Sequence, residues 1–229
     1  MIVNSIINTY FKKENTMKII IFGAAGNVGS RIVNEALERG HQVSAVVRKS
    51  DQLHKLPKAV KGCTGDAQNV SDVTKLTAGH DLVISAVRPP SGHEQLLVPI
   101  TQAILEGASE SGVRVLVVGG AASLKIPGQQ DTTVLSAENF LPEDVKPIAR
   151  ACFAQHQAIE QVQNTDWAYL SPPAMLVPGV RTGQYRLGSD ELLYDKDGSS
   201  KISMEDFAVV LLDEGETPKH HKVRFTAAY

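Results

Sequence analysis

The chain has 229 residues, 42% of them hydrophobic, and a formal net charge of −2. A chain of this length and composition can bury one sizeable core, and α/β folds of this size are often single domains. It has no long run of like charge, so we expect no nucleic-acid partner and no anionic membrane surface. Since no apolar stretch approaches the roughly 20 residues of a membrane span, we expect no membrane association.

Residues 1–16 precede the first regular pattern of the sequence. They lack the basic start and the small-residue cleavage site of a signal peptide, because Lys12 and Lys13 follow the apolar part instead of preceding it. We therefore expect an N-terminal extension that is dispensable for folding and for cofactor binding.

The two cysteines, Cys63 and Cys152, stand far apart and outside any CxxC or metal-ligand spacing. Such sparse usage is typical of a reducing compartment, so we expect a cytoplasmic protein without a disulfide or a metal site. We interpret each cysteine as a small buried hydrophobe.

A β-branched apolar run at 18–22 leads directly into the sequence GAAGNVG at 23–29. An amphipathic segment, 31–39, follows, and a second apolar run spans 42–47. This order predicts a strand, a glycine loop, a helix and a second strand. A dinucleotide pyrophosphate could then bind backbone N–H groups at the positive end of the helix. A merely tight turn between strand and helix is the alternative.

The three glycines of this loop have separate expected tasks. Gly23 can end the strand in a tight turn, and Gly26 leaves room for a phosphate to approach the backbone. Gly29 lets the helix lie close to the sheet.

Further apolar runs alternate with helical periodicity along the chain. They lie at 60–64, 81–87, 113–118 and 167–171. This alternation predicts an α/β fold with a Rossmann-type doubly wound parallel sheet formed by residues 17–171. The proline-rich stretch 119–147 is too long for a simple loop, and it leaves the carboxyl end of a strand, so we expect it to lie over the cofactor cleft.

The alternation stops after residue 171. Short strand-like pieces lie near 184–187 and 192–194, a helix is expected to begin at Ser203, and 223–226 has the pattern of a last strand. We expect residues 172–229 to form a small substrate-capping lobe that packs on the core as part of one domain.

Seven short motifs carry a family resemblance, and their order along the chain is more specific than any one of them. They are GAAGNVG at 23–29, VVR at 46–48, GDA at 65–67, ISAV at 84–87, VVGGAAS at 117–123, SPP at 171–173 and PGVRTGQYRLG at 178–188. Over residues 17–229 the chain resembles the NAD(P)H-binding group of atypical short-chain dehydrogenases/reductases. Within that group it is similar to NADH-flavin reductases, flavin/biliverdin-IXβ reductases and NmrA-like proteins.

The resemblance implies a set of binding residues. The loop from Gly23 would hold the pyrophosphate, Arg48 the adenosine 2′-phosphate, Asp66 the adenine, and Ala86 the ribose nearest the nicotinamide. The implied cofactor residues are Gly23, Ala25, Gly26, Asn27, Val28, Gly29, Arg48, Asp66, Ala67, Ala86 and Val87. Substrate contacts are expected at Pro172, Pro173 and Met175.

Arg48 also follows from the residue pattern alone. Sites specific for NAD place an acid at the end of the second strand, but residues 41–50 contain none. Arg48 and Lys49 stand there instead, and a guanidinium matches a phosphate in charge and in geometry. We therefore expect NADPH to be preferred over NADH; a solvated basic pair on a loop is the alternative.

No tyrosine of this chain has a lysine four residues later, which is the pair that acidifies the catalytic tyrosine in typical members of the superfamily. A reductase without a dedicated proton donor suits an acceptor that takes hydride readily and finds its proton in solvent. We therefore expect a flavin, a quinone or a similar flat molecule as substrate.

His156 is the one candidate for catalytic assistance. Its segment, AQHQAIE at 154–160, resembles the segment of flavin/biliverdin-IXβ reductases that carries an active-site histidine. An exposed or structural histidine is the alternative. The serine that those reductases carry after the fifth strand is not securely matched, because Ala121 and Ala122 precede Ser123.

Two classes of function stay open on these residues. The first is an NADPH-dependent oxidoreductase acting on a flat acceptor, and the second is an NmrA-like redox sensor that binds NAD(P) without turnover. An epimerase or dehydratase is less favoured because such enzymes normally need the missing tyrosine and lysine. The residues do not indicate an oligomeric state.

Overall fold

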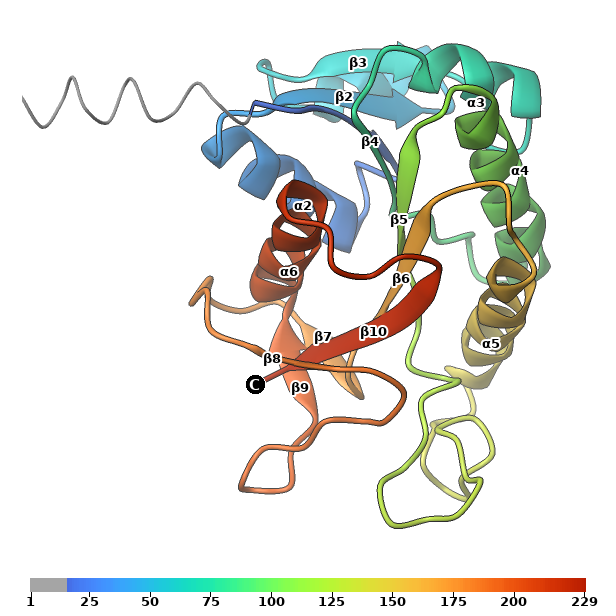
Figure 1. The fold of residues 1–229 in the computed structure, drawn as a ribbon, viewed down its shortest axis with the longest axis vertical. Helices are drawn as coiled ribbons and strands as arrows, with labels where there is room; N and C mark the ends of the chain where they lie inside the picture. Colours follow the sequence, from blue (N-terminus) through green and yellow to red (C-terminus); the bar gives the residue numbers. More distant parts are fainter. Residues whose placement is uncertain (1–15) are drawn as a thin grey trace, which may run out of the picture.

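The computed structural model describes residues 16–229, which form two sheets flanked by helices (Figure 1). The strands are β1 (Lys18–Phe22), β2 (Gln42–Val47), β3 (Lys61–Thr64), β4 (Leu82–Ser85), β5 (Arg114–Val118), β6 (Trp167–Ser171), β7 (Met175–Val177), β8 (Arg186–Gly188), β9 (Lys201–Ser203) and β10 (Val223–Ala228). The helices are α2 (Asn27–Glu38), α3 (Val70–Thr77), α4 (Leu97–Glu110), α5 (Lys146–Glu160) and α6 (Met204–Glu216), with short 3₁₀ helices η1 (Ser50–Lys55) and η2 (Glu94–Leu96). The expectation that residues 1–16 are dispensable concerns a segment outside the described residues, except for residue 16, and stays a prediction.

The main sheet has the order β3-β2-β1-β4-β5-β6-β10-β8. All neighbouring pairs are parallel except β10 with β8. The strand order reverses between β1 and β4, which is the switch point where α/β sheets bind ligands. The predicted Rossmann-type, doubly wound fold is therefore confirmed.

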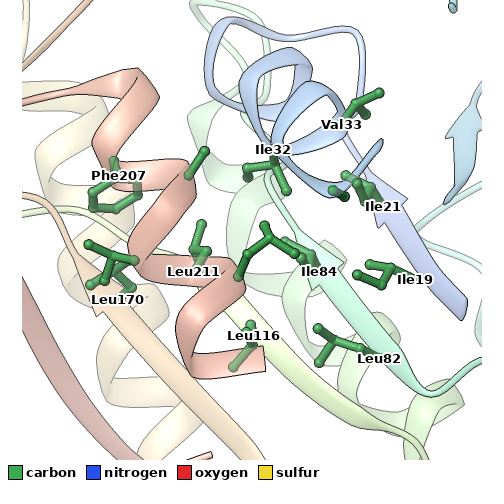
Figure 2. Packing of buried hydrophobic residues seen from close by; sticks show 14 of the residues in the cluster. Ile19, Ile21, Ile32, Val33, Leu82, Ile84, Leu116, Leu170, Phe207 and Leu211 are labelled. Atoms are coloured by element: carbon green, nitrogen blue, oxygen red, sulfur yellow. The ribbon is translucent and has the colours of Figure 1, made fainter. Parts of the chain in front are cut away.

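Helices cover both faces of this sheet. On one face α2 and α6 lie side by side, and on the other α3, α4 and α5 form a row (Figure 1). Each face of the sheet carries a hydrophobic core, and successive strand residues point to opposite faces. Ile19 and Ile21 point toward α2 and α6 (Figure 2), whereas Ile20 belongs to the cluster beneath α4. Burial on both faces explains why these strands are continuous apolar runs.

Residues after 171 complete the core layers. β10 pairs with β6, and α6 contributes Phe207 and Leu211 to the cluster shown in Figure 2. The helix begins as the sequence predicts, because the Ser203 hydroxyl accepts a hydrogen bond of 2.9 Å from the Asp206 N–H. The predicted C-terminal lobe thus shares the sheet with residues 17–171.

The small strands of this segment differ from the prediction. The strand expected near 192–194 is absent, and β7 and β9, which were not expected, pair with each other in parallel. Each has three residues, too few for an alternating pattern to be visible in sequence. None of the helices in residues 16–229 is long and apolar enough to cross a membrane.

Candidate functional site

The glycine loop between β1 and α2 is packed against β4. Gly23 has φ +80°, and a Cβ there would lie 2.4 Å from the Ala86 carbonyl oxygen. A Cβ on Gly29 would lie 2.1 Å from the Gly23 carbonyl oxygen, so this glycine brings α2 against the turn. Both positions therefore require glycine, as the sequence predicts.

The first turn of α2 leaves backbone donors free. Gly26 stands at the cap position without a side chain to accept a hydrogen bond. Among the described residues, the N–H groups of Asn27, Val28 and Gly29 have no backbone acceptor. An uncapped helix start carries a partial positive charge, so this turn fits the pyrophosphate of a dinucleotide.

The loop opens into a cavity of about 710 Å³. Its glycine-loop half is lined by residues of 22–28, 46–52, 65–68 and 86–87. Its apolar half is lined by residues of 119–122 and 172–176, by Val134, Leu141 and Val145, and by Ile148, Ala149 and Cys152 of α5. The volume is typical of a site for a small molecule or cofactor.

The cavity gathers most of the residues expected in the site. Those that line it are Gly23, Ala25, Gly26, Asn27, Val28, Arg48, Asp66, Ala67, Ala86, Val87, Pro172 and Pro173. Gly29 packs behind the loop instead. Met175 is 53% exposed and does not line the cavity, because strand alternation turns its neighbour Leu176 inward.

Arg48 follows β2 and lies at the glycine-loop end of the cavity, where it is exposed. Within the described part of the chain its guanidinium makes no ion pair, whereas Arg31, Arg39 and Arg181 are paired with carboxylates. An unpaired cation in this position is available to a bound phosphate.

A pair of glycines forms the floor of the apolar half. A Cβ on Gly119 would lie 2.1 Å from the Tyr169 ring, so only glycine lets the backbone rest on this fully buried side chain. The Tyr169 hydroxyl accepts from the Gly120 N–H at 3.1 Å and lies 3.1 Å from Gln155 Oε1. Burial raises the pKa of Tyr169 far above its ordinary value. This tyrosine is a structural support and not an accessible acid.

His156 lies beside this network and is 7% exposed. Its ring meets the Tyr169 ring edge-on at 5.1 Å, and burial lowers its pKa, with the Arg224 charge acting in the same direction. His156 does not line the cavity; Gln155, the preceding residue on α5, does. Its catalytic role stays a prediction, and the observed surroundings are those of a structural histidine.

The serine after β5 also has a structural partner. Ser123 Oγ accepts a hydrogen bond of 2.8 Å from Arg224, which in turn pairs with Asp190. Ser123 lies outside the cavity lining, and Ala121 and Ala122 face the cavity in its place. The apolar half therefore lacks a serine hydroxyl at this position.

Several residues of the apolar half were not recognised from the sequence, Cys152 and Met204 among them. Cys152 was interpreted as a buried hydrophobe, but it is half-buried and lines the cavity. Burial raises the pKa of its thiol to about 11, so the thiol stays protonated near neutral pH. Met204, the first residue of α6, also lines the cavity. Neither stands in a motif that would have marked it.

The sequence matches the family described as NAD(P)H-binding over residues 23–218. The chain belongs to this family. The free donors at the α2 start fit the phosphate groups of such a cofactor. The protein therefore binds NAD(P)H and belongs to an oxidoreductase family.

Three relatives show how far this similarity extends. The uncharacterized protein YwnB of Bacillus subtilis (strain 168) is 35% identical over 216 residues, which cover 92% of this chain and 97% of YwnB. A provisionally assigned epimerase from Bacteroides thetaiotaomicron is 38% identical with a TM-score of 0.84, covering 93% and 97% of the two chains. A provisionally assigned NADH-flavin reductase from Streptococcus pneumoniae TIGR4 is 31% identical with a TM-score of 0.82, covering 93% and 99%.

Proposed function

We propose that this protein reduces a flat, conjugated acceptor such as a flavin or a quinone, using NADPH as the hydride donor. The observation that carries the proposal is the apolar half of the cavity, which adjoins the glycine loop; among residues 16–229 it presents no side chain suited to act as a general acid. NADPH would supply a hydride from its nicotinamide ring. The acceptor then takes its proton from solvent.

The glycine-loop half fits this cofactor. The free N–H groups at the start of α2 would bind the pyrophosphate, and the backbone at Ala86 and Val87 would contact the nicotinamide ribose. Arg48 would bind the 2′-phosphate and favour NADPH over NADH. These contacts hold the reacting ring at the border with the apolar half.

The shape of the apolar half favours a flat acceptor. Gly119 and Gly120 provide a floor without side chains, and Pro172 and Pro173 contribute to an apolar wall. Ile148 and Ala149 of α5 add further apolar lining. Such walls exclude water and orient a planar ring, and orientation can contribute several kcal/mol to lowering a reaction barrier.

The absence of an acid separates this reaction from carbonyl reduction. Cys152 lines the apolar half, but its thiol has a pKa of about 11 and gives up its proton poorly near neutral pH. Tyr169 does not line the cavity, because it lies beneath Gly119. A ketone or an aldehyde needs a proton at its oxygen as hydride arrives, whereas a flavin or a quinone accepts hydride without that assistance. The provisionally assigned NADH-flavin reductase among the relatives gives the proposal further support.

The test is NADPH oxidation measured anaerobically with riboflavin, flavin mononucleotide and menadione. We expect turnover with at least one of them, and a lower rate with NADH. Ile148→Trp would fill the apolar half and should reduce turnover strongly while leaving the dissociation constant of NADPH unchanged. Arg150→Trp, an exposed position on the same helix outside the cavity lining, is the matched control.

NADPH binding without oxidation in the presence of any of these acceptors would contradict the proposal. That result would favour the NmrA-like sensor instead. An equal loss of activity in the Ile148 and Arg150 variants would mean that the apolar half is not the acceptor site.

A further inference from the structure

Arg88 occupies a special position along the cavity. It follows Ala86 and Val87, the backbone that meets the glycine loop, and it lines the cavity itself. Its loop leads into η2, which packs against α5, the helix that carries the wall of the apolar half. Arg88 therefore lies past the nicotinamide end of the expected cofactor site, on the side of the acceptor.

The guanidinium of Arg88 has no protein partner. Within residues 16–229 it makes no hydrogen bond and no ion pair. The nearby acid Glu94, the first residue of η2, makes no ion pair with Arg88 and accepts a hydrogen bond of 3.0 Å from the Gly92 N–H. Backbone hydrogen bonds lower the pKa of Glu94 most, and the Arg88 charge adds a smaller effect in the same direction. The Arg88 charge nevertheless acts on the apolar half, where it lowers the pKa of the Cys152 thiol against the larger effect of burial.

Arg88 is the one charged residue that lines the apolar half of the cavity in the described part of the chain. The other charged residues that line the described cavity, Arg48 and Asp66, lie in its glycine-loop half. The apolar half thus meets one cation and no carboxylate. Pro89 follows Arg88 directly and restricts the Arg88 backbone to extended conformations, which reduces the backbone entropy lost when a ligand binds there.

We propose that Arg88 is a specificity residue that binds an oxyanion, a phosphate or a carboxylate, projecting from the flat ring of the acceptor. The inference rests on the proposed function in one respect, because it takes the apolar half as the acceptor site. It goes further in naming the substrate class: an anionic acceptor, such as a phosphorylated flavin, over a neutral one of the same ring. A guanidinium recognises such groups through charge-assisted, often bidentate, hydrogen bonds.

Flavin mononucleotide and riboflavin provide the matched pair of probes, since they share one ring system and differ by a phosphate. Their affinities for the NADP⁺-loaded protein can be measured by quenching of flavin fluorescence, which does not depend on turnover. We expect flavin mononucleotide to bind roughly tenfold more tightly than riboflavin. This gain in affinity is small for a charge-assisted contact, because Arg88 is exposed to solvent. In Arg88→Ala the two affinities should become equal through loss of flavin mononucleotide binding.

Two variants control this measurement. Arg88→Lys keeps the charge and should retain part of the preference, whereas Arg150→Ala removes an exposed arginine outside the cavity lining and should leave the preference intact. A carboxylated and an unsubstituted anthraquinone, each measured by its competition with flavin mononucleotide, show whether Arg88 binds a carboxylate as well as a phosphate.

Three outcomes would overturn the assignment: equal wild-type affinity for the two flavins, equal weakening of both by Arg88→Ala, or weakening of NADPH binding instead, which would place Arg88 at the cofactor pyrophosphate. A clear preference for flavin mononucleotide without any NADPH oxidation would support the anion site and contradict the proposed reaction. The two proposals can therefore fail separately.

Discussion

Arginines at the α2–α6 interface and arginines at the cavity have different surroundings. At the interface, Arg39 and Arg181 approach the two carboxylate oxygens of Glu35 at 2.7 and 2.6 Å. At the cavity, Arg48 and Arg88 have no ion-pair partner among residues 16–229. Charge at the interface joins α2 to the C-terminal segment, whereas charge at the cavity remains available to a ligand.

Burial explains the difference. Glu35 is 4% exposed, and a carboxylate at such a position is destabilising unless it is paired and hydrogen-bonded. Arg48 and Arg88 are exposed and keep their hydration, so they need no protein partner. Four predictions, from the largest expected effect to the smallest, test whether the interface provides stability and the cavity provides binding.

Arg39→Ala tests the interface most severely. Arg39 also pairs with Asp213 and Glu216 of α6, so its loss leaves three carboxylates together without their common cation. We expect the free energy of unfolding to fall by about 3 kcal/mol and Tm by roughly 6–12 °C. Thermal unfolding checks this, with NADPH affinity unchanged.

Arg31→Ala is the control for Arg39. Its pair with Glu205 is single and partly exposed, so we expect a loss below about 1 kcal/mol. Equal effects of the two substitutions would contradict the idea that the shared cation holds this interface together.

Arg48→Ala tests the cavity. Removing a charge-assisted contact to phosphate should cost about 1.5–3 kcal/mol, or roughly 10- to 150-fold in NADPH affinity, with little change for NADH. Titration calorimetry with both cofactors is the measurement, and Lys49→Ala, which removes a charge outside the cavity lining, is the control. Equal weakening of NADPH and NADH, or tighter wild-type binding of NADH, would refute the assignment.

Glu35→Gln tests, through the pH dependence of stability, whether the charge of Glu35 stabilises the α2–α6 interface. Burial alone would raise the pKa of Glu35, but hydrogen bonds from Arg181 and Arg39 outweigh it and hold the pKa below its ordinary value of 4.5. Because the pKa of Glu35 is lower in the folded protein than in the unfolded chain, its ionised carboxylate stabilises the fold at pH values above the unfolded-state pKa. This stabilisation is lost as the pH falls through the folded-state pKa.

We therefore expect Glu35→Gln to be less stable than the wild type at pH 7 by about 1–2 kcal/mol, with a difference that narrows below about pH 4.5. Denaturant unfolding at several pH values measures it. A difference that stays constant from pH 7 to pH 3 would show that Glu35 contributes packing and not charge.

His156→Ala should have the smallest effect of the four substitutions, a modest loss of turnover. The side chain packs against Tyr169 and does not line the cavity, so we expect a loss of about tenfold or less, below the roughly 10²–10⁴ of an obligatory acid or base. Steady-state rates over a range of pH are the measurement. A larger loss, accompanied by a changed pH profile, would identify His156 as a general acid after all.

The sequence by itself determined the parallel sheet and the glycine loop at which the cavity opens. Strands buried on both faces need continuous apolar runs, and the turn at Gly23 needs a positive φ angle, so both leave local signals. The sequence also shows that no tyrosine has a lysine four residues later, which argues against a tyrosine as the catalytic proton donor. Each of these features depends on residues that are neighbours in the chain.

Only the tertiary structure decided how polar side chains are used. Glu35 lies on a helix where a carboxylate usually faces water, and its burial depends on Arg181, far along the chain. Ser123 is occupied by Arg224, and His156 packs against Tyr169 beneath the glycine floor. These contacts join segments distant in sequence, and no local pattern of residue types encodes which of them will meet.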